Sequence, residues 1–273
     1  MTDLERDKMI DYKAEIAKAK KQFSKNKIEA IVLGPSGSGK SALGGTFSGK
    51  TLYLYGSAEN HGPKSAMTYG GQEVDPICID KDRTPDDAIK LLLDILGDSA
   101  FLKGYAAIVI DSATVLEDII RNTKEFKLSC LSAKGQHNTF AEGPAMLTIF
   151  NKIMTLLRDS DKDYLVTCIL DVQSLDSDSG EIMESKPRLS TYAVAEGLIQ
   201  QFPDVLVIGP MTKGDKCAHR LQFSAGVKRN STDESGSIKK TINFRPRITG
   251  AKTLPASCAA SMEEVRKLKE VKV

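Results

Sequence analysis

Residues 34–41 read GPSGSGKS and match the phosphate-binding loop pattern G-x-x-x-x-G-K-[ST] at every fixed position. Glycines allow the backbone to fold tightly, so that successive N–H groups point into one hollow of the size of an anion. In this pattern the lysine reaches the β- and γ-phosphates, and the last hydroxyl ligates Mg²⁺. We therefore predict a Mg·ATP site whose cofactor-binding residues are Gly34, Pro35, Ser36, Gly37, Ser38, Gly39, Lys40 and Ser41.

The segments on either side of this loop suit the pattern. Ile28 to Leu33 is a short apolar run, which is typical of a buried strand. Behind the loop, Ala42, Leu43 and Phe47 can open a helix, and a helix N-terminus adds partial positive charge where a phosphate would bind. A chance match of a Gly/Ser loop would not require this order of strand, loop and helix.

Asp111 is the second candidate for metal chemistry. It ends the apolar run Tyr105 to Ile110, which predicts a buried strand. Ligands of open α/β sheets bind beyond the carboxyl ends of the strands, where a carboxylate can hold the hydration shell of Mg²⁺. A surface aspartate that merely ends a strand is the alternative, and the nearby loop favours the metal role. The predicted metal site is Ser41 and Asp111.

Hydrolysis also needs a group that orients the attacking water. Many phosphate-loop ATPases place a glutamate directly after the metal aspartate, but Ser112 stands there in this chain. The best candidate is Glu59, in the segment GSAEN after a predicted strand at 51–55, although a loop glutamate without a catalytic role fits equally well. We predict that Glu59 and Lys40 carry the catalytic roles.

Two further polar candidates follow the predicted strand at 164–170, namely Asp171 and Gln173. A polar side chain at such a strand end could sense the γ-phosphate and pass its state to the following loop. An exposed strand end without this role is an equally good interpretation.

One motif competes with ATP as the ligand. Residues 212–215 read TKGD after a predicted strand and resemble the guanine-reading motif [NT]-K-x-D. A GTPase also needs D-x-x-G at the metal aspartate, but residues 111–114 read DSAT. The missing glycine favours ATP.

The rest of the chain alternates predicted strands and helices. Strands are expected at 51–55, 105–110 and 164–170, and helices at 84–96, 115–126 and 144–157. Continuous apolar strands separated by helices indicate a parallel sheet with helices on both faces. We predict an α/β ATPase domain over residues 28–273, with an antiparallel extension at about 205–250 and a C-terminal helix at about 261–270.

Residues 1–27 precede this domain. Residues 2–23 are expected to form an amphipathic helix, and a short polar hinge follows it. The apolar stripe of this helix consists of Met9, Tyr12, Ile16, Ala19 and Phe23. Such a helix could pack on its own core or dock on a neighbouring subunit.

The composition is that of an ordinary globular protein, with 41% hydrophobic and 27% charged residues. No apolar run approaches the length of a membrane span, and the charged N-terminus is unlike a secretory signal. The five cysteines are scattered without a CxxC pair, so neither a disulfide framework nor a zinc site is suggested. We expect a cytoplasmic protein without a membrane partner.

The net charge of +2 is unevenly distributed. Residues 186–273 carry 16 Lys and Arg against 8 Asp and Glu. A basic segment of this kind is compatible with a polyanionic partner. On charge alone, a solvated surface is the simpler explanation.

Taken together, GPSGSGKS, the glutamate after the next strand and the strand AAIVIDS resemble the RecA-like recombination ATPases. The closest likeness is to compact phage-encoded members associated with single-strand annealing and recombination. The resemblance implies a RecA-like core, a catalytic base at Glu59, a homo-oligomeric ring or filament, and the cytoplasm of a bacterial host. Because LQFSAGVKRN and KKTINFRPR resemble the family's last hairpin strands, it also implies that Lys228 and Arg229 reach a neighbour's nucleotide.

The same resemblance implies single-stranded DNA as the partner, bound by loops at 129–143 and 174–192. The second loop begins acidic and becomes basic only near its end. The DNA-binding candidates are Lys186, Arg188, Lys239 and Lys240. Two alternatives stay open: a nucleotide-dependent assembly or regulatory protein that binds no DNA, and a DNA packaging or remodelling motor.

Overall fold

The computed structural model describes residues 27–69, 73–175, 182–213, 216–222, 231–232, 238–239 and 261–270. The predicted N-terminal helix at 2–23 and residues 241–250 of the predicted extension lie outside these ranges.

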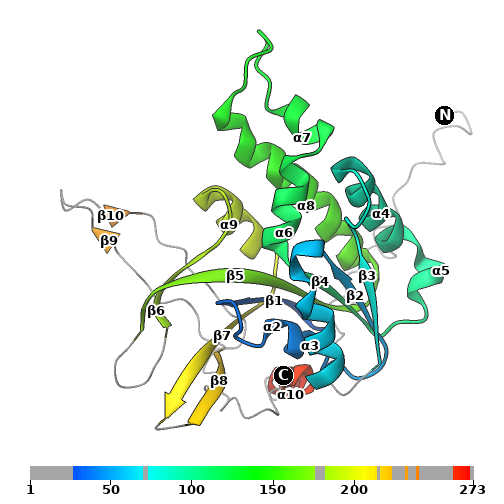
Figure 1. The fold of residues 1–273 in the computed structure, drawn as a ribbon, viewed down its shortest axis with the longest axis vertical. Coiled ribbons are helices and arrows are strands. Elements are labelled where there is room, and N and C mark those ends of the chain that lie inside the picture. Colours follow the sequence, from blue (N-terminus) through cyan, green and yellow to red (C-terminus); the bar gives the residue numbers. More distant parts are fainter. Residues whose placement is uncertain are drawn as a thin grey trace, which may run out of the picture.

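The centre of the fold is a sheet of six parallel strands in the order β3-β2-β4-β5-β1-β7 (Figure 1). Their bounds are Glu29–Gly34 for β1, Thr51–Tyr55 for β2, Val74–Cys78 for β3, Ala107–Asp111 for β4, Asp163–Leu175 for β5 and Asp204–Lys213 for β7. Two antiparallel strands extend it, β6 (Ile182–Pro187) beside β5 and β8 (Lys216–Gln222) beside β7. The short strands β9 (Ser231–Thr232) and β10 (Ile238–Lys239) form a separate pair.

Helices cover both faces of this sheet. The bounds are Lys40–Gly44 for α2, His61–Tyr69 for α3, Pro85–Gly97 for α4, Ser99–Leu102 for α5, Ala113–Arg121 for α6, Lys124–Ser129 for α7, Glu142–Asp159 for α8, Tyr192–Ile199 for α9 and Met262–Glu270 for α10, with 3-10 turns at Ser57–Glu59 (η2) and Thr139–Ala141 (η3). Successive side chains along each strand point to opposite faces of the sheet. In β1, Ile31 and Leu33 join the core formed with α4, α6, α8 and α9, whereas Ala30 and Val32 join the core formed with α2, α3 and α10. The predicted α/β class with a covered parallel sheet is confirmed.

Local capping explains why α4 begins where the sequence predicted. The side chain of Thr84 accepts a hydrogen bond from the backbone N–H of Asp87, and Pro85 occupies the first helical position. The predicted start of this helix is confirmed.

The predicted helix at 115–126 is wrong, because the chain breaks there into α6 and α7. The Thr123 hydroxyl donates to the carbonyl of Ile120 at 2.7 Å and accepts from the N–H of Phe126 at 3.2 Å. A threonine that binds backbone groups in this way competes with helix propagation and caps a new helix instead.

The predicted strand end at residue 170 is also wrong. β5 continues to Leu175 and pairs with β6, so that Asp171 lies opposite Lys186 in the register. Asp171 and Gln173 therefore lie within a strand and not at its end. The predicted DNA loop at 174–192 contains the end of β5, the whole of β6 and the start of α9, a helix that the sequence analysis did not predict.

The antiparallel extension begins later than residue 205. β7 pairs in parallel with β1 from Asp204 to Val207 and turns to antiparallel pairing with β8 from Val207 onward. Thr212 and Lys213 lie inside β7, so the TKGD segment begins within an antiparallel hairpin. The segment was predicted to follow a strand, but its first two residues are the last two residues of β7.

The C-terminal helix is confirmed as α10, which packs beside the end of α2. The N–H of Met262 donates to Thr46 Oγ1 at 3.0 Å, and Ser48 Oγ donates to Glu263 Oε1 at 2.7 Å. Within the described ranges, no helix combines the length and the apolar character needed to cross a bilayer.

Candidate functional site

The 34–41 loop connects β1 to α2 at the carboxyl edge of the sheet (Figure 1). Gly37 and Gly39 have φ angles of 76° and 91°, which residues with side chains rarely adopt. A Cβ on Gly34 would lie 2.5 Å from Ser38 Oγ. α2 has only five residues, so the loop N–H groups and the lysine must supply most of the positive charge.

Lys40 is 7% exposed and folded against this loop. Its Nζ donates to the carbonyl of Gly34 at 2.9 Å and to that of Pro35 at 2.8 Å. Burial lowers the pKa of Lys40, while Asp111 and Glu59 act in the opposite direction. The ammonium thus lies within electrostatic range of both predicted acids.

Asp111 is 2% exposed, and hydroxyl groups surround its carboxylate. Ser41 Oγ donates to Oδ2 at 2.8 Å, and Tyr53 Oη donates to the same oxygen. Thr167 Oγ1 donates to Oδ1. Tyr53 lies on β2 and Thr167 on β5, the two strands that flank β4. The predicted pair of Ser41 and Asp111 is therefore brought together, with two hydroxyls that the sequence analysis missed.

The first turn of α3 closes over this carboxylate. A Cβ on Gly62 would lie 2.3 Å from Asp111 Oδ2, 3.1 Å from Tyr53 Oη and 3.3 Å from Ser41 Oγ. Only glycine permits this approach. Burial and the charge of Asp111 raise the pKa of Tyr53, so the phenol remains a hydrogen-bond donor at working pH.

Glu59 lies in η2, half-buried beside the end of β4. Ser112 Oγ donates to Glu59 Oε1 at 3.2 Å and caps α6 by accepting from the N–H of Val115 at 3.3 Å. Burial and the charge of Asp111 raise the pKa of Glu59, whereas Ser112 and Lys40 lower it. Ser112, which stands where many phosphate-loop ATPases have a glutamate, therefore holds the predicted base.

Asp80, just beyond β3, fixes the other side of η2. The N–H and Oγ of Ser57 donate to its two carboxylate oxygens at 2.7 and 2.8 Å. The segment that carries Glu59 is thus held at both ends by side-chain hydrogen bonds.

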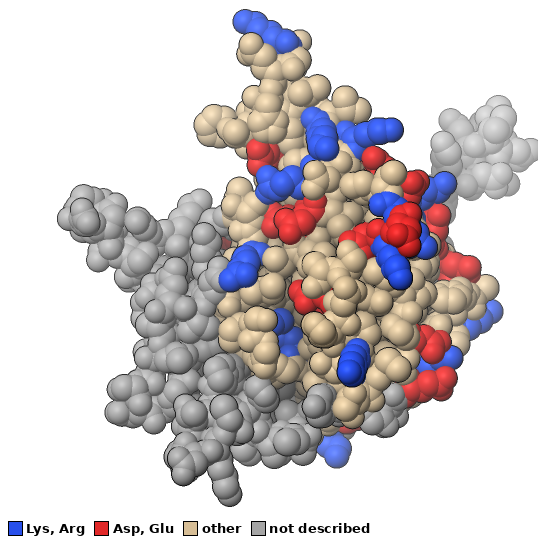
Figure 2. All heavy atoms as spheres, in the orientation of Figure 1, with Lys and Arg blue, Asp and Glu red and all other residues tan. Residues whose placement is uncertain are grey.

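The other predicted site residues belong to other elements or lie outside the described ranges. Asp171, Gln173 and Lys186 lie in the β5–β6 hairpin, and Arg188 follows it with an exposed side chain. Lys239 lies in β10, which belongs to the separate strand pair. Lys228, Arg229 and Lys240 lie outside the described residues. On the described part of the face in Figure 2, basic and acidic side chains are interspersed.

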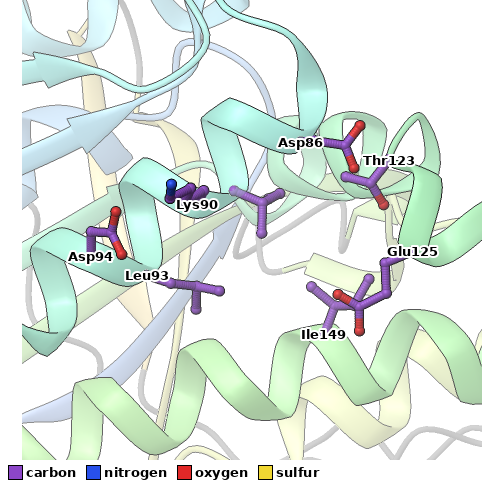
Figure 3. A pocket seen from close by; sticks show the side chains of 8 residues that line it. Asp86, Lys90, Leu93, Asp94, Thr123, Glu125 and Ile149 are labelled. Atoms are coloured by element: carbon purple, nitrogen blue, oxygen red, sulfur yellow. The ribbon is translucent and has the colours of Figure 1, made fainter.

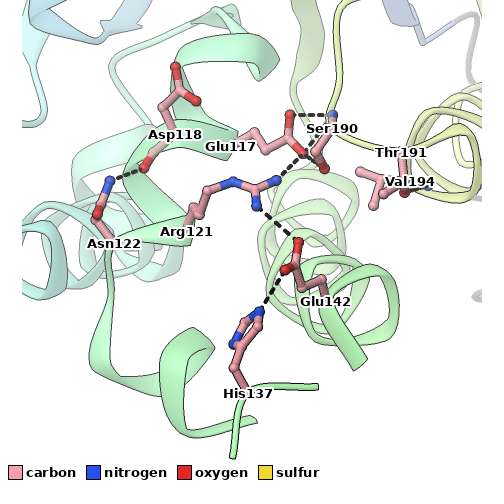
Figure 4. Close-up of polar contacts among 9 residues, drawn as sticks. All are labelled: Glu117, Asp118, Arg121, Asn122, His137, Glu142, Ser190, Thr191 and Val194. Atoms are coloured by element: carbon pink, nitrogen blue, oxygen red, sulfur yellow. Dashed lines mark hydrogen bonds and ion pairs between the residues drawn. The ribbon is translucent and has the colours of Figure 1, made fainter. Parts of the chain in front are cut away.

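A second buried carboxylate lies one helix turn beyond the site. Glu117 on α6 is 4% exposed and accepts from the N–H of Ser190 at 2.9 and 3.0 Å and from its hydroxyl. Arg121 contacts Glu117 at 3.6 Å and Glu142 at 3.0 Å, and His137 contacts Glu142 at 2.8 Å (Figure 4). This network joins α6, α8, the segment before η3 and the segment that precedes α9.

The described chain also has a shallow groove between α4, α7 and α8, with a volume of about 200 Å³ (Figure 3). It is lined by Asp86, Ile89, Lys90, Leu93, Asp94, Thr123, Glu125 and Ile149. None of these residues belongs to the cluster around Asp111, so the groove and the candidate site are separate.

The donor set around Asp111 fits a magnesium nucleotide. In the described ranges, no three His, Cys, Asp or Glu residues converge on a possible metal position. Mg²⁺ commonly uses one or two carboxylates together with substrate phosphates and waters, and Ser41 and Asp111 match that small donor set. The Ser38 hydroxyl is buried in the loop without a hydrogen-bond partner in the described structure, and a phosphate oxygen would accept from it.

No protein-family model matches this chain, and no curated protein matches it. The functional interpretation therefore rests on the chain's own residues and their geometry.

Proposed function

We propose that this protein is a RecA-like ATPase that binds Mg·ATP at the 34–41 loop and acts on single-stranded DNA. The observation that carries the nucleotide part is the convergence of four residues from three elements: Lys40 and Ser41 from α2, Glu59 from η2 and Asp111 from β4. The parallel sheet with covered faces and an antiparallel extension at β8 agrees with the architecture that the RecA-like resemblance implies.

Each residue has a defined role in this proposal. Bound Mg·ATP supplies the phosphoanhydride and the cation that spreads its charge. Lys40 exchanges the carbonyls of Gly34 and Pro35 for phosphate oxygens, and Ser41 and Asp111 hold the metal and its water shell. Glu59 orients the attacking water and accepts its proton, a task that suits a carboxylate whose pKa is raised.

The DNA part of the proposal has a different basis. The basic balance of residues 186–273 supports it, as do Lys186 and Arg188 at the end of the β5–β6 hairpin. Assembly into a homo-oligomer is part of the same proposal, because a neighbour would bring Lys228 and Arg229 to the nucleotide. The mixed charges on the described part of the face in Figure 2 favour one rival, a nucleotide-dependent assembly protein without DNA.

Calorimetric titration with Mg·ATP tests the nucleotide site. Wild type should bind with micromolar affinity, about 8 kcal/mol, and Lys40→Ala should lose that binding while keeping its fold. Lys64→Ala, a change of a lysine on α3, is the matched control and should bind as wild type does. Equal Mg·ATP affinity in the Lys40→Ala protein would overturn the assignment.

Turnover separates catalysis from binding. Glu59→Gln should bind Mg·ATP normally but hydrolyse it about 10²- to 10⁴-fold more slowly, because an amide cannot act as a base. Adding single-stranded DNA at low salt should accelerate the wild-type reaction, with affinity that falls as salt rises. Hydrolysis without any binding or stimulation by DNA would favour the assembly rival.

A further inference from the structure

We propose that Tyr53 and Thr167 are positioning residues for the metal: their hydroxyls hold the Asp111 carboxylate in the orientation that Mg²⁺ needs. This inference rests on the proposed function of the 34–41 loop. No sequence pattern indicated a functional role for either residue, because each lies in an apolar run that predicts a buried strand.

Of the three hydrogen bonds to this carboxylate, two come from fixed donors and one comes from an exchangeable donor. Two oxygens offer about four acceptor positions. Tyr53 uses one on Oδ2, and Thr167 uses one on Oδ1. Ser41 uses another on Oδ2, but Ser41 belongs to the loop that would bind the metal. Exchange of the Ser41 bond on metal binding would therefore leave the carboxylate held by its other two donors.

The two fixed donors come from the buried centre of the sheet. Tyr53 and Thr167 are both fully buried, and they lie on the strands paired to either side of β4. In the register, Val109 lies opposite both Tyr53 and Leu165. The first turn of α3, with Gly62 against Asp111 Oδ2, closes the remaining side.

Hydroxyl donors also suit the chemistry better than a cation would. A neutral donor orients a carboxylate without cancelling its charge, whereas an arginine or lysine would compete with Mg²⁺ for the same oxygens. Within the described residues, Asp111 has hydroxyl partners and no ion pair, since Lys40 Nζ donates to carbonyls.

Tyr53→Phe and Thr167→Val remove one hydroxyl each and nearly preserve volume. ATP binding is measured calorimetrically over a series of Mg²⁺ concentrations and again in excess chelator. We expect each variant to need about tenfold more Mg²⁺ for half-maximal enhancement of ATP binding. The affinity for metal-free ATP should stay at the wild-type value, because Lys40 and the loop are untouched.

The same chain offers matched controls. Tyr55→Phe removes a hydroxyl two residues along β2 that is hydrogen-bonded to Cys78. Thr51→Val removes a buried hydroxyl that has no hydrogen-bond partner in the described structure. Both controls should keep the wild-type Mg²⁺ dependence. Thermal unfolding of every variant shows whether the fold is retained.

A double variant distinguishes positioning from general packing. In an Asp111→Asn background, adding Tyr53→Phe should change the Mg²⁺ dependence no further. A wild-type Mg²⁺ dependence in folded Tyr53→Phe and Thr167→Val proteins would overturn the inference, as would an equal loss of metal-free ATP affinity. Absence of ATP binding by wild type would instead overturn the proposed function on which the inference rests.

Discussion

Asp111 and Glu117 are two buried carboxylates six positions apart, one at the end of β4 and the other on α6, yet their surroundings differ in kind. Glu117 accepts from a backbone N–H and a serine hydroxyl and contacts the guanidinium of Arg121. Asp111 accepts from three hydroxyls, and the nearby ammonium of Lys40 is bound to carbonyls instead.

Glu117 connects neighbouring elements of the fold through hydrogen bonds and an ion pair. The Asp111 carboxylate, by contrast, accepts hydrogen bonds from neutral hydroxyl donors. The negative charge of Glu117 is paired with Arg121 inside the protein. Glu117 therefore connects α6 to Ser190 and, through Arg121, to Glu142 on α8 (Figure 4). The charge of Asp111 is oriented but not cancelled. A buried charge that is left in this state is costly for folding and useful for binding a cation.

The largest effect on stability should come from Glu117→Ala. It removes the charged acceptor of the Ser190 N–H and hydroxyl and leaves Arg121 with Glu142 alone. Because hydrogen bonds to a charged group contribute about 1.5–3 kcal/mol and Arg121 is partly solvated, we expect a loss of about 2–3 kcal/mol. Chemical denaturation measures this loss in the free energy of unfolding. Glu125→Ala is the control, because Glu125 forms an exposed ion pair with Lys152 and should cost under about 1 kcal/mol.

Asp111→Asn should show the opposite pattern. Mg²⁺-dependent ATP affinity should fall about 100-fold, or about 2.7 kcal/mol, because the anionic ligand is lost. The free energy of unfolding should stay within about 1 kcal/mol of wild type or increase, since a buried charge is removed. If Asp111→Asn lowered the free energy of unfolding more than Glu117→Ala does, the proposed difference between the two carboxylates would be wrong.

Arg121→Met tests how much of the Glu117 network depends on its cation. Arg121 is about one third exposed, so solvent screens its ion pairs. We expect a loss of about 1 kcal/mol in the free energy of unfolding, less than that of Glu117→Ala. ATP binding should not change, and a reduced affinity would show that the two carboxylates are coupled.

The smallest effect should be a shift in the pH profile of ATP hydrolysis. Burial and Asp111 raise the pKa of Glu59, so turnover should rise with pH as Glu59 loses its proton. Ser112 lowers this pKa by its hydrogen bond, and Ser112→Ala should therefore move the rise to higher pH. An unchanged pH profile in the Ser112→Ala protein would show that Ser112 does not influence the pKa of the catalytic base.

Local chemistry explains which features could be predicted from the sequence. The 34–41 loop, the strand that ends at Asp111 and the capped start of α4 each depend on neighbouring residues, and all three appear where expected. The position of Glu59 followed from mechanism, because the site needed an acid after β2.

The missed features depend on contacts between distant segments. Tyr53 and Thr167 occur in apolar strands, where a hydroxyl gives no signal until strand order places it beside Asp111. The extent of β5 depends on pairing with β6. The break before α7 is a local exception, because the Thr123 hydroxyl binds backbone groups only three residues away. The role of Glu117 becomes visible only when Ser190 is brought to α6.

The most direct test of the central claim is an experimental structure of the protein with Mg²⁺ and a non-hydrolysable ATP analogue. The account predicts the metal between Ser41 Oγ and the Asp111 carboxylate, with Lys40 Nζ moved from the carbonyls of Gly34 and Pro35 to the β- and γ-phosphates. Glu59 should face the γ-phosphate. A nucleotide bound elsewhere, with Lys40 still on those carbonyls, would contradict the account.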